Sequence, residues 1–451
     1  MMSAIEAAAL VSGRVSGGEA RFDAVSTDSR TIGRGELFVA LRGERFDGHD
    51  FLDAAAARGA AVALVDRHYA GAFPLPVIIV HDTKRALGEL AGRWRARFSP
   101  ALVAVTGSNG KTTVKEMLAA ILRRHAGERS VLSTSGNLNN DIGLPLTLLR
   151  LTAEHRWCAI ELGMNHRGEI AYLARLAAPG VALVNNAQRE HLEFMGSVDE
   201  VAAENATVYD ALPADGVAVV NADDEHAAYF RSRAGARRIV DFGLRSAMVS
   251  GGYALEQLSS ELRLRTPQGE AGATLAIPGL HNVRNALAAA ACAHAAGVEL
   301  PAIAAGLSAF RPYSGRLQVK QARDGITLID DSYNANPDSV RAAIDVLASC
   351  AAPTVLVLGD MGEVGAHGPE FHREIGAYAR ARGVSQLLAL GEASTHAVAA
   401  FGAGARHFDD VEALVPAIRG RTVLVKGSRF MRMERVVAAL VGGGIPSEAA
   451  H

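Results

Sequence analysis

Continuous apolar runs alternate with segments of helical periodicity along most of this 451-residue chain. The runs at 157–162, 181–185 and 354–358 have no polar alternation, which is typical of strands buried on both faces of a sheet. At 338–348 and 370–381 apolar residues recur at the spacing of one helix face. The alternation predicts an α/β protein whose mostly parallel sheets are covered by helices.

The same pattern predicts three domains. Residues 1–98 carry short strand-like runs and form a small α/β domain, whereas 99–313 form a central domain with a mostly parallel sheet. Residues 314–451 repeat strand and helix regularly and predict a doubly wound, Rossmann-like domain. The first junction is the segment 93–100, which we expect to be a connector, and the second is a Pro- and Gly-containing hinge at 311–316.

One stretch of the central domain breaks this rhythm. Between 246 and 277 polar and apolar residues alternate, with Leu262 and Leu264 as examples. Such alternation is typical of strands with one solvated face, so it predicts an antiparallel extension of the central sheet.

The segment 107–113, G-S-N-G-K-T-T, follows an apolar strand and precedes a predicted helix. Gly107 and Gly110 allow backbone N–H groups to approach phosphate oxygens, Lys111 supplies a positive charge, and the Thr112 hydroxyl can bind Mg²⁺. The usual phosphate-loop pattern has another glycine two residues before Gly107, where this chain has valine. The segment nevertheless predicts binding of ATP or GTP rather than a simple turn.

Composition narrows the function classes. The net charge is −2 and no basic stripe occurs, so we expect no nucleic-acid partner. No apolar run is long enough to cross a bilayer, and we expect no membrane insertion and a cytoplasmic location. Cys158, Cys292 and Cys350 are far apart within apolar segments and are expected to be buried free thiols.

Asparagines cluster at 135–145, S-G-N-L-N-N-D-I-G-L-P. Asn137, Asn139 and Asn140 could line a pocket for a polar substrate with neutral hydrogen-bonding groups. Glycine, proline and asparagine are also the residues that turns prefer. Both interpretations remain open from the residues alone.

Four further polar residues have both a functional and a structural interpretation. Glu161 ends a strand beside the phosphate loop, where a carboxylate is well placed to hold Mg²⁺. His191 also follows a strand, although a single histidine is usually structural. Asn282 and Asn285 lie three residues apart and could face one ligand or cap a helix.

Three polar loops of the third domain each follow a predicted strand. They are D-D-S-Y-N-A-N-P at 330–337, G-D-M-G-E-V-G at 359–365 and K-G-S-R at 426–429. Because parallel strands end at the same edge of a sheet, these loops predict one shared site.

In this order, the segments resemble the Mur ligase family, ATP-dependent amide-forming enzymes of peptidoglycan synthesis. The resemblance spans nearly the whole chain, and the shortened phosphate loop is the form that this family uses. The motifs that carry it are S-T-D-S-R (26–30), G-E-L-F-V-A-L-R-G (35–43), D-G-H-D-F (47–51), G-N-L-N-N-D-I-G-L-P (136–145), D-D-S-Y-N-A-N-P (330–337), V-L-G-D-M-G-E-V-G (357–365) and V-K-G-S-R-F-M-R-M-E (425–434).

Within the family, the C-terminal motifs favour the branch that adds D-alanyl-D-alanine to UDP-N-acetylmuramoyl-tripeptide. The nearest alternatives are the ligase that adds the third amino acid and the folylpolyglutamate synthetases. A protein that hydrolyses ATP only to switch conformation is an alternative of another class.

The resemblance implies a role for each matching residue. The ATP phosphates would be held by Gly107, Ser108, Asn109, Gly110, Lys111, Thr112, Thr113 and Arg316, adenine by Asn282 and Asn285, ribose by Asp331, and Mg²⁺ by Thr112, Glu161 and His191. The implied catalytic residues are Lys111, Glu161, His191 and Arg316. The implied substrate-binding residues are Ser29, Arg30, Arg42 and Gly43 for uridine, Asn137, Asn139 and Asn140 for the tripeptide, and Asn334, Asn336, Lys426 and Ser428 for the dipeptide.

The chain departs from the family pattern at one position. Relatives carry a lysine fourteen residues after the histidine that matches His191, modified to a carbamate that supports a second Mg²⁺. Here that residue is Asn205, and no lysine occurs between Lys115 and Lys320. We therefore expect Asn205 or the adjacent Glu204 to substitute for the carbamate.

The implied ATP and dipeptide residues lie on different predicted domains, so closure about residues 314–316 is expected during the reaction. His372 could assist the ligation step or cap its helix. The implied partners are small molecules only, and we expect a monomer.

Overall fold

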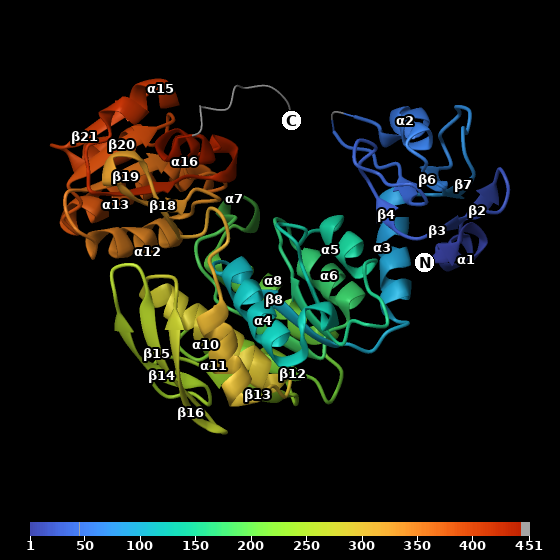
Figure 1. Ribbon diagram of the computed structural model, residues 1–451, viewed down its shortest axis with the longest axis horizontal. Helices are drawn as coiled ribbons and strands as arrows, with labels where there is room; N and C mark the ends of the chain where they lie inside the picture. Colours follow the sequence, from blue (N-terminus) through green and yellow to red (C-terminus); the bar gives the residue numbers. More distant parts are fainter. Residues whose placement is uncertain (45, 443–451) are drawn as a thin grey trace.

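Three lobes follow one another along the chain in the computed structural model, which describes residues 1–44 and 46–442 (Figure 1). The N-terminal lobe, in blue, and the C-terminal lobe, in orange and red, flank a central lobe in cyan to yellow. Each lobe contains a mostly parallel sheet with helices, as the hydrophobic pattern predicts.

The N-terminal lobe contains a five-stranded sheet in the order β2-β7-β6-β5-β4, parallel except for β2. Its strands are β2 (Arg14–Ser16), β4 (Val25–Ser26), β5 (Leu37–Val39), β6 (Val62–Asp66) and β7 (Val77–Val80), and a small second sheet pairs β1 (Met2–Ser3) with β3 (Arg21–Phe22). Its helices are α1 (Ala4–Leu10), α2 (Leu52–Ala57) and α3 (Thr83–Arg95).

The predicted connector at 93–100 is only partly a connector, because α3 continues to Arg95. The Trp94 indole N–H donates to Leu151 O at 3.0 Å, and the Arg95 guanidinium donates to Ala177 O at 2.8 Å. The end of α3 therefore packs against the central lobe, and these contacts favour continuation of the helix over an extended linker.

The central sheet has the order β13-β12-β11-β8-β10-β9, and all five pairings are parallel. The strands are β8 (Ala101–Thr106), β9 (Val131–Ser133), β10 (Trp157–Glu161), β11 (Val181–Val184), β12 (Val217–Asn221) and β13 (Arg238–Phe242). The helices are α4 (Lys111–Ala126), α5 (Gly143–Leu148), α6 (Glu169–Ala177), α7 (Leu192–Met195), α8 (Val198–Ala206), α9 (Ala227–Ala234), α10 (Leu280–Ala295) and α11 (Leu300–Ala309).

Helix α4 carries the phosphate loop at its N-terminus and is fixed by its apolar face. Val114, Met117, Leu118, Ile121 and Leu122 recur at helical spacing, and all five are fully buried. Since this face packs on the sheet, on α10 and on α11, the loop that precedes the helix has a rigid base.

The prediction for 246–277 is right about antiparallel strands and wrong about where they lie. Strands β14 (Ser250–Leu255), β15 (Ser260–Thr266) and β16 (Gly269–Leu275) form a separate three-stranded sheet. Leu262 and Leu264 point into the core that this sheet shares with α10 and α11, while the alternate residues of β15 are exposed. This packing explains why the hairpins leave the central sheet rather than extend it.

The C-terminal sheet has the order β17-β18-β22-β19-β20-β21, and only β17 is antiparallel to its neighbour. The strands are β17 (Gln318–Gln321), β18 (Thr327–Asp331), β19 (Thr354–Gly359), β20 (Gln386–Leu390), β21 (Ala405–Phe408) and β22 (Thr422–Lys426). The helices are α12 (Pro337–Ala348), α13 (Gly368–Ala381), α14 (Thr395–Phe401), α15 (Val411–Leu414) and α16 (Glu434–Val441).

In this sheet β18, β22 and β19 are neighbours, so the three polar loops that follow them lie at one edge, as predicted. The cysteines are free, and Cys158 and Cys292 are buried, but Cys350 is only half-buried. It follows the end of α12, where the chain leaves the core. Within the described residues, no helix is both long enough and apolar enough to cross a membrane.

Gly306 allows α11 to lie close to α4. A Cβ atom at this position would lie 2.3 Å from Ile121 Cα, a backbone atom that cannot move aside. We predict that Gly306→Ala lowers the free energy of unfolding by about 1–3 kcal/mol because it overpacks this contact. Urea denaturation followed by circular dichroism measures the change.

Gly272→Ala on β16 is the matched control, because no heavy atom lies within 4 Å of its Cβ position. Equal stability of the two variants would show that the α4–α11 contact tolerates a side chain.

Candidate active site

A cavity of about 830 Å³ lies where the lobes meet, with lining residues from all three. It extends from Lys84 on α3, across the phosphate loop, to Arg429 and Phe430 after β22. Predicted site residues that line it are Ser108, Asn109, Gly110, Lys111, Thr112, Asn137, Asn139, Asn140, Glu161, His191, Arg316, Asn334, Asn336, Lys426 and Ser428. Most of the central and C-terminal candidates therefore share one cavity.

The phosphate loop needs glycine at two positions. Gly107 has φ 126° and Gly110 has φ 82°, both in the left-handed region. A Cβ at Gly107 would lie 2.9 Å from Asn185 N, and one at Gly110 would lie 2.3 Å from Asn285 Oδ1. Gly110 precedes α4 without any side-chain cap, so the first N–H groups of that helix can bind an anion.

Lys111 is folded back over this loop. Its Nζ donates to Gly107 O at 2.6 Å and Ser108 O at 2.8 Å, and it lies 3.2 Å from Glu190 Oε2. The ammonium group is thus held at the loop where phosphate oxygens would bind, with Glu190 as its counter-charge.

Glu161, at the end of β10, supplies the clearest metal-binding feature. Its Oε1 accepts from Asn139 Nδ2 at 2.7 Å and from the Thr112 hydroxyl at 3.3 Å, but its buried Oε2 has no hydrogen-bond partner. The described residues contain no cluster of three His, Cys, Asp or Glu side chains that could hold a metal. Mg²⁺ does not need such a cluster, because it retains several waters and binds through one or two carboxylates and substrate phosphates. The Glu161 carboxylate and the Thr112 hydroxyl therefore fit Mg²⁺.

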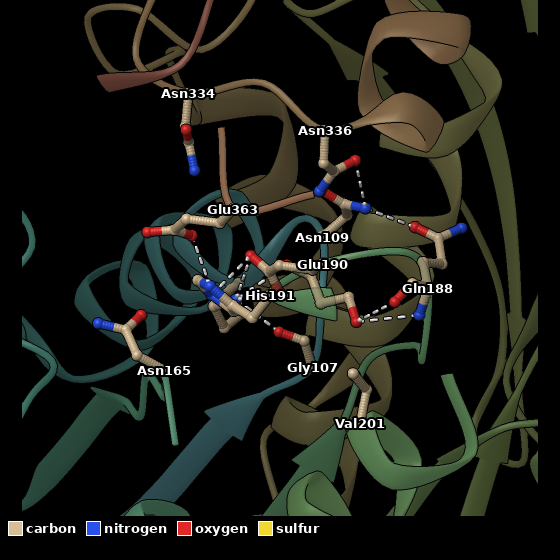
Figure 2. Close-up of polar contacts among 12 residues, drawn as sticks. Gly107, Asn109, Asn165, Gln188, Glu190, His191, Val201, Asn334, Asn336 and Glu363 are labelled. Carbon is tan, nitrogen blue, oxygen red and sulfur yellow. Dashed lines mark hydrogen bonds and ion pairs between the residues drawn. The ribbon is translucent and has the colours of Figure 1, made fainter. Parts of the chain in front are cut away.

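His191 faces the same cavity from the loop after β11. It has φ 52°, and its Nδ1 lies 2.6 Å from Glu363 Oε2 across the boundary with the C-terminal lobe (Figure 2). Its Nε2 lies 3.6 Å from Glu190 Oε1. Hydrogen bonding to His191 lowers the pKa of the Glu363 carboxyl.

Arg316 reaches from the hinge to the phosphate loop. Its Nη2 lies 3.4 Å from Thr112 Oγ1, and its guanidinium carbon lies 4.1 Å from the centre of the Tyr333 ring. Its buried Nε has no hydrogen-bond partner. The guanidinium can therefore still bind an anion in the cavity.

Asp331 and Lys426 form a buried ion pair at 2.5 Å. Burial raises the pKa of the Asp331 carboxyl and lowers that of the Lys426 ammonium. Asp331 Oδ1 also accepts from Leu317 N at 3.2 Å, and Lys426 donates to Asn334 O at 2.9 Å. The pair braces the hinge against the sheet, and Asp331 does not line the cavity.

In the asparagine-rich loop, one asparagine forms a turn and another contacts a residue of the cavity. Asn140 Oδ1 accepts from Gly143 N at 2.8 Å and from Ile142 N at 3.2 Å, as in a turn. Asn139 instead donates to Glu161. One carboxamide therefore shapes the loop, while the other positions the carboxylate of the site.

Asn282 and Asn285 do not line the cavity, and neither caps α10, which begins after Gly279. Asn282 Nδ2 donates to Pro278 O at 2.7 Å, and Asn285 Oδ1 accepts from Asn185 Nδ2 at 3.0 Å. Both are buried and support the phosphate loop from behind. The capping interpretation is wrong, and adenine contact stays a prediction.

The N-terminal candidates lie outside this cavity, on turns of their own lobe. Arg30 binds Asp28 through two hydrogen bonds of 2.9 Å, and Arg42 pairs with Asp47 at 2.9 Å. Ser29 and Gly43 are their neighbours in sequence. Their role toward uridine stays a prediction.

The residues predicted near the dipeptide also hold local structure. Asn336 caps α12 and donates from Nδ2 to Asn109 Oδ1 at 2.9 Å, which joins the C-terminal lobe to the phosphate loop (Figure 2). Ser428 Oγ accepts from Gly362 N at 2.7 Å and donates to Ala335 O at 3.1 Å. These residues bring the three C-terminal loops together.

Neither candidate replacement for the carbamate is a free ligand. Glu204 accepts from Gly168 N at 2.8 Å and Ile170 N at 2.9 Å, so it stabilises the N-terminus of α6. Asn205 Oδ1 accepts from the Thr106 hydroxyl at 2.7 Å, and its Nδ2 donates to the backbone at 3.0 Å. Asn205 therefore supports the base of the phosphate loop.

His372 has a different role from the two considered. It is fully buried, its Nε2 accepts from Met361 N at 3.0 Å, and its Nδ1 bonds to Gly368 O at 2.7 Å. Burial lowers the pKa of its imidazole, which favours the neutral form that can accept one bond and donate the other. His372 fixes the loop that presents Glu363.

Four further residues that line the cavity have no individual role in the sequence analysis, namely Glu190, Tyr333, Glu363 and Arg429. Tyr333, Glu363 and Arg429 lie within the three strand-end loops predicted to share a site, whereas Glu190 lies outside them, beside His191. Their contacts, however, involve residues far apart in the chain and are visible only in three dimensions.

Family comparisons match each lobe separately. The models described as "Mur ligase family, catalytic domain", "Mur ligase middle domain" and "Mur ligase, glutamate ligase domain" match residues 21–95, 105–293 and 315–429. The matches cover most of the chain in the order of the three lobes.

Individual relatives match over nearly the full length. The chain is 43% identical to the UDP-N-acetylmuramoyl-tripeptide–D-alanyl-D-alanine ligase of Escherichia coli strain K12 (96% of this chain, 97% of the relative) and 40% identical to that of Haemophilus influenzae (97% and 98%). Among solved structures, MurF from Acinetobacter baumannii has a TM-score of 0.91 at 35% identity, covering 98% of both chains. MurF ligase from Thermotoga maritima in complex with ADP has a TM-score of 0.79 at 26% identity, covering 92% of this chain and 96% of its own.

The bonds of His372 generate a prediction. A glutamine at this position cannot satisfy both Met361 N and Gly368 O in the same geometry, so His372→Gln should lower the free energy of unfolding by about 1–3 kcal/mol at pH 7.5. Because the folded-state pKa lies below the unfolded value, this contribution is present above about pH 6.5 and is lost as pH falls through the folded pKa. Urea denaturation between pH 7.5 and 5 tests both statements.

His367→Gln, at an exposed position before the same helix, is the control and should change stability little. The assignment fails if His372→Gln retains the full pH dependence of the native chain.

Proposed function

The chain belongs to the Mur ligase family, and we propose that it joins D-alanyl-D-alanine to UDP-N-acetylmuramoyl-tripeptide in an ATP-dependent reaction. The products are the UDP-linked pentapeptide, ADP and phosphate. The chain is at least 40% identical, over nearly its full length, to two ligases whose name states this reaction, and this similarity supports the assignment. The likeness to a MurF structure supports it as well.

One observation carries the proposal. The phosphate loop, the orphaned oxygen of Glu161 and the strand-end loops of the C-terminal lobe face one cavity. An enzyme that joins two substrates by way of ATP needs such convergence, whereas a nucleotide-driven switch does not need a second and third substrate site.

In the first step, a carboxylate oxygen of the tripeptide attacks the γ-phosphorus of ATP. The bond from phosphorus to the bridging oxygen of ADP breaks, leaving an acyl phosphate. Two anions must meet, so positive charge near the reacting atoms lowers the barrier. Lys111 and Arg316 supply it, and Thr112, Glu161 and His191 would hold Mg²⁺, which adds charge beside the phosphates.

In the second step, the uncharged amine of the dipeptide attacks the acyl carbon. Phosphate leaves with the electron pair of the broken C–O bond, and the amine passes a proton to the departing phosphate or to solvent as the amide forms. Positioning dominates this step because the acyl phosphate is already activated. Asn334 and Arg429, on the cavity side of the C-terminal lobe, are the proposed contacts of the dipeptide.

We further propose that the enzyme works in the cytoplasm, where ATP and its nucleotide-sugar substrate are available, and that it acts as a monomer. Its substrates are small molecules. Uridine recognition by Ser29, Arg30, Arg42 and Gly43 and ribose contact by Asp331 belong to the same proposal.

Phosphate release tests the proposed function. Purified protein with ATP, Mg²⁺ and UDP-N-acetylmuramoyl-tripeptide should release phosphate at a sustained rate only when D-alanyl-D-alanine is added. The assay should be run with tripeptides ending in diaminopimelate and in lysine.

Lys111→Ala is the matched negative variant and should lower the rate by about 10³-fold. A rate that is indifferent to the dipeptide would identify a nucleotide switch instead, and full activity of Lys111→Ala would remove the phosphate loop from the reaction.

The absence of a lysine at position 205 generates a second prediction. Bicarbonate should leave turnover of the native chain unchanged, because no lysine between Lys115 and Lys320 can form a carbamate. Asn205→Ala should reduce turnover at limiting Mg²⁺ by about 10-fold, since it releases Thr106 beneath the phosphate loop. Stimulation of the native enzyme by bicarbonate would contradict this account.

A further inference from the structure

Residues 188–191, Q-R-E-H, follow β11 and lie between the phosphate loop and the C-terminal lobe. We call this stretch the coupling segment. Its four side chains make contacts on two sides, as Figure 2 shows for three of them. The segment therefore connects two parts of the protein, in addition to any contact that it makes with a substrate.

The first and third residues of the coupling segment contact the phosphate loop. Asn109 Nδ2 donates to Gln188 Oε1 at 2.7 Å, and Gln188 N donates to Ser108 Oγ at 2.9 Å. Glu190 pairs with Lys111 at 3.2 Å.

The second and fourth residues contact the C-terminal lobe. His191 meets Glu363, while Arg189 binds Asp338 on α12 and Glu374 on α13. Alternate residues of the coupling segment therefore contact the phosphate loop and the C-terminal lobe, which must come together for the ligation to occur.

Arg189 makes the most extensive of these contacts. Its guanidinium lies 2.6 Å from Asp338 Oδ1 and 2.7 Å from Glu374 Oε2, and its backbone N–H donates to Asp338 Oδ2 at 2.9 Å. The guanidinium carbon also lies 5.2 Å from the centre of the Phe371 ring. Only about a quarter of the side chain is exposed.

Several features distinguish this contact from an ordinary surface ion pair. A guanidinium that meets two carboxylates in fixed geometry, with an aromatic ring beneath it, is strongly oriented. Burial lowers the pKa of Arg189, but its hydrogen bonds to the two carboxylates outweigh this effect and raise the pKa above its usual value. Asp338 lies in the first turn of α12, two residues after Asn336, so the same contact fixes Asn336 on Asn109 of the phosphate loop.

We propose that Arg189 is a positioning residue that holds the C-terminal lobe, and with it Glu363 and Asn336, over the phosphate loop during ligation. Its contribution is to align the dipeptide side of the cavity with the nucleotide side. Most of the proposed nucleotide contacts belong to the central lobe, whose phosphate loop does not contact the Arg189 side chain, and only Arg316 and Asp331 reach the nucleotide from the C-terminal side. The inference rests on the proposed function for its kinetic readout only.

The test compares nucleotide binding with dipeptide use. Arg189→Ala should bind a non-hydrolysable ATP analogue in Mg²⁺ within about fivefold of the native affinity, measured by calorimetry, because the phosphate loop is intact and only the contacts of Arg316 and Asp331 weaken. Its kcat/KM for D-alanyl-D-alanine should fall by about 10-fold to 100-fold, since one member of a half-buried charge pair is removed. Arg189→Lys, which retains the charge without the two-pronged geometry, should recover part of the loss.

Arg341→Ala is the matched control. Arg341 binds the same Glu374 at 3.0 Å, but from α12 within the C-terminal lobe, so its loss removes no contact between lobes. This variant should remain within about twofold of the native kcat/KM. Exchange of the charges in Arg189→Asp with Asp338→Arg should restore more activity than either single substitution retains.

A readout without turnover separates this inference from the proposed function. Small-angle scattering with the ATP analogue should show a larger radius of gyration for Arg189→Ala than for the native chain, whatever reaction is catalysed. Arg189→Gln, which retains most of the side-chain volume, serves if the alanine variant is unstable. The proposal is overturned if the Arg189 variants have the native radius of gyration and the native kcat/KM for the dipeptide. It is also overturned if Arg341→Ala loses as much kcat/KM as Arg189→Ala, or if affinity for the ATP analogue falls as far as kcat/KM does.

Discussion

The parallel pairing of β8 with β11 is the constraint on which the site depends. Thr106 lies opposite Val184 in this register, so the loops after the two strands begin side by side. Ser108 N donates to Asn186 O at 3.0 Å, and Asn109 N donates to Asn186 Oδ1 at 2.8 Å. The phosphate loop and the coupling segment are consequently one unit, and neither can be displaced without the other.

Positive and negative side chains are nearly balanced in the cavity where the three lobes meet. Lys111 and Arg316 place two cations beside the N-terminus of α4, and carboxylates from all sides of the cavity balance them. The charge that remains unmatched by hydrogen bonds, on Glu161 Oε2, is where a cation fits. Substrate anions can therefore be accommodated without leaving the resting cavity with a large excess of either charge.

Local patterns in the chain predict the fold well, because strands buried on both faces and helices with one apolar face have distinct periodicities. They also point to residues at or beyond strand ends, such as Glu161 and His191, and to Lys111 at the start of α4. They fail where a role depends on a partner far along the chain. Arg189 and Asp338 are 149 residues apart, and the bond of His372 to Met361 depends on how a loop folds back. Alternation of polar and apolar residues predicts the antiparallel strands of 246–277, but it does not predict that they pack on α10 and α11.

Together, the phosphate loop and the coupling segment form the site at which we expect the nucleotide to bind. A crystal structure with a non-hydrolysable ATP analogue and Mg²⁺ would show whether it does so. We expect triphosphate density along residues 107–113, Lys111 displaced from Glu190 onto the phosphates, and a Mg²⁺ ion within bonding distance of Glu161 and Thr112. A nucleotide bound elsewhere, or a triphosphate in this loop with Lys111 still paired to Glu190, would contradict this expectation.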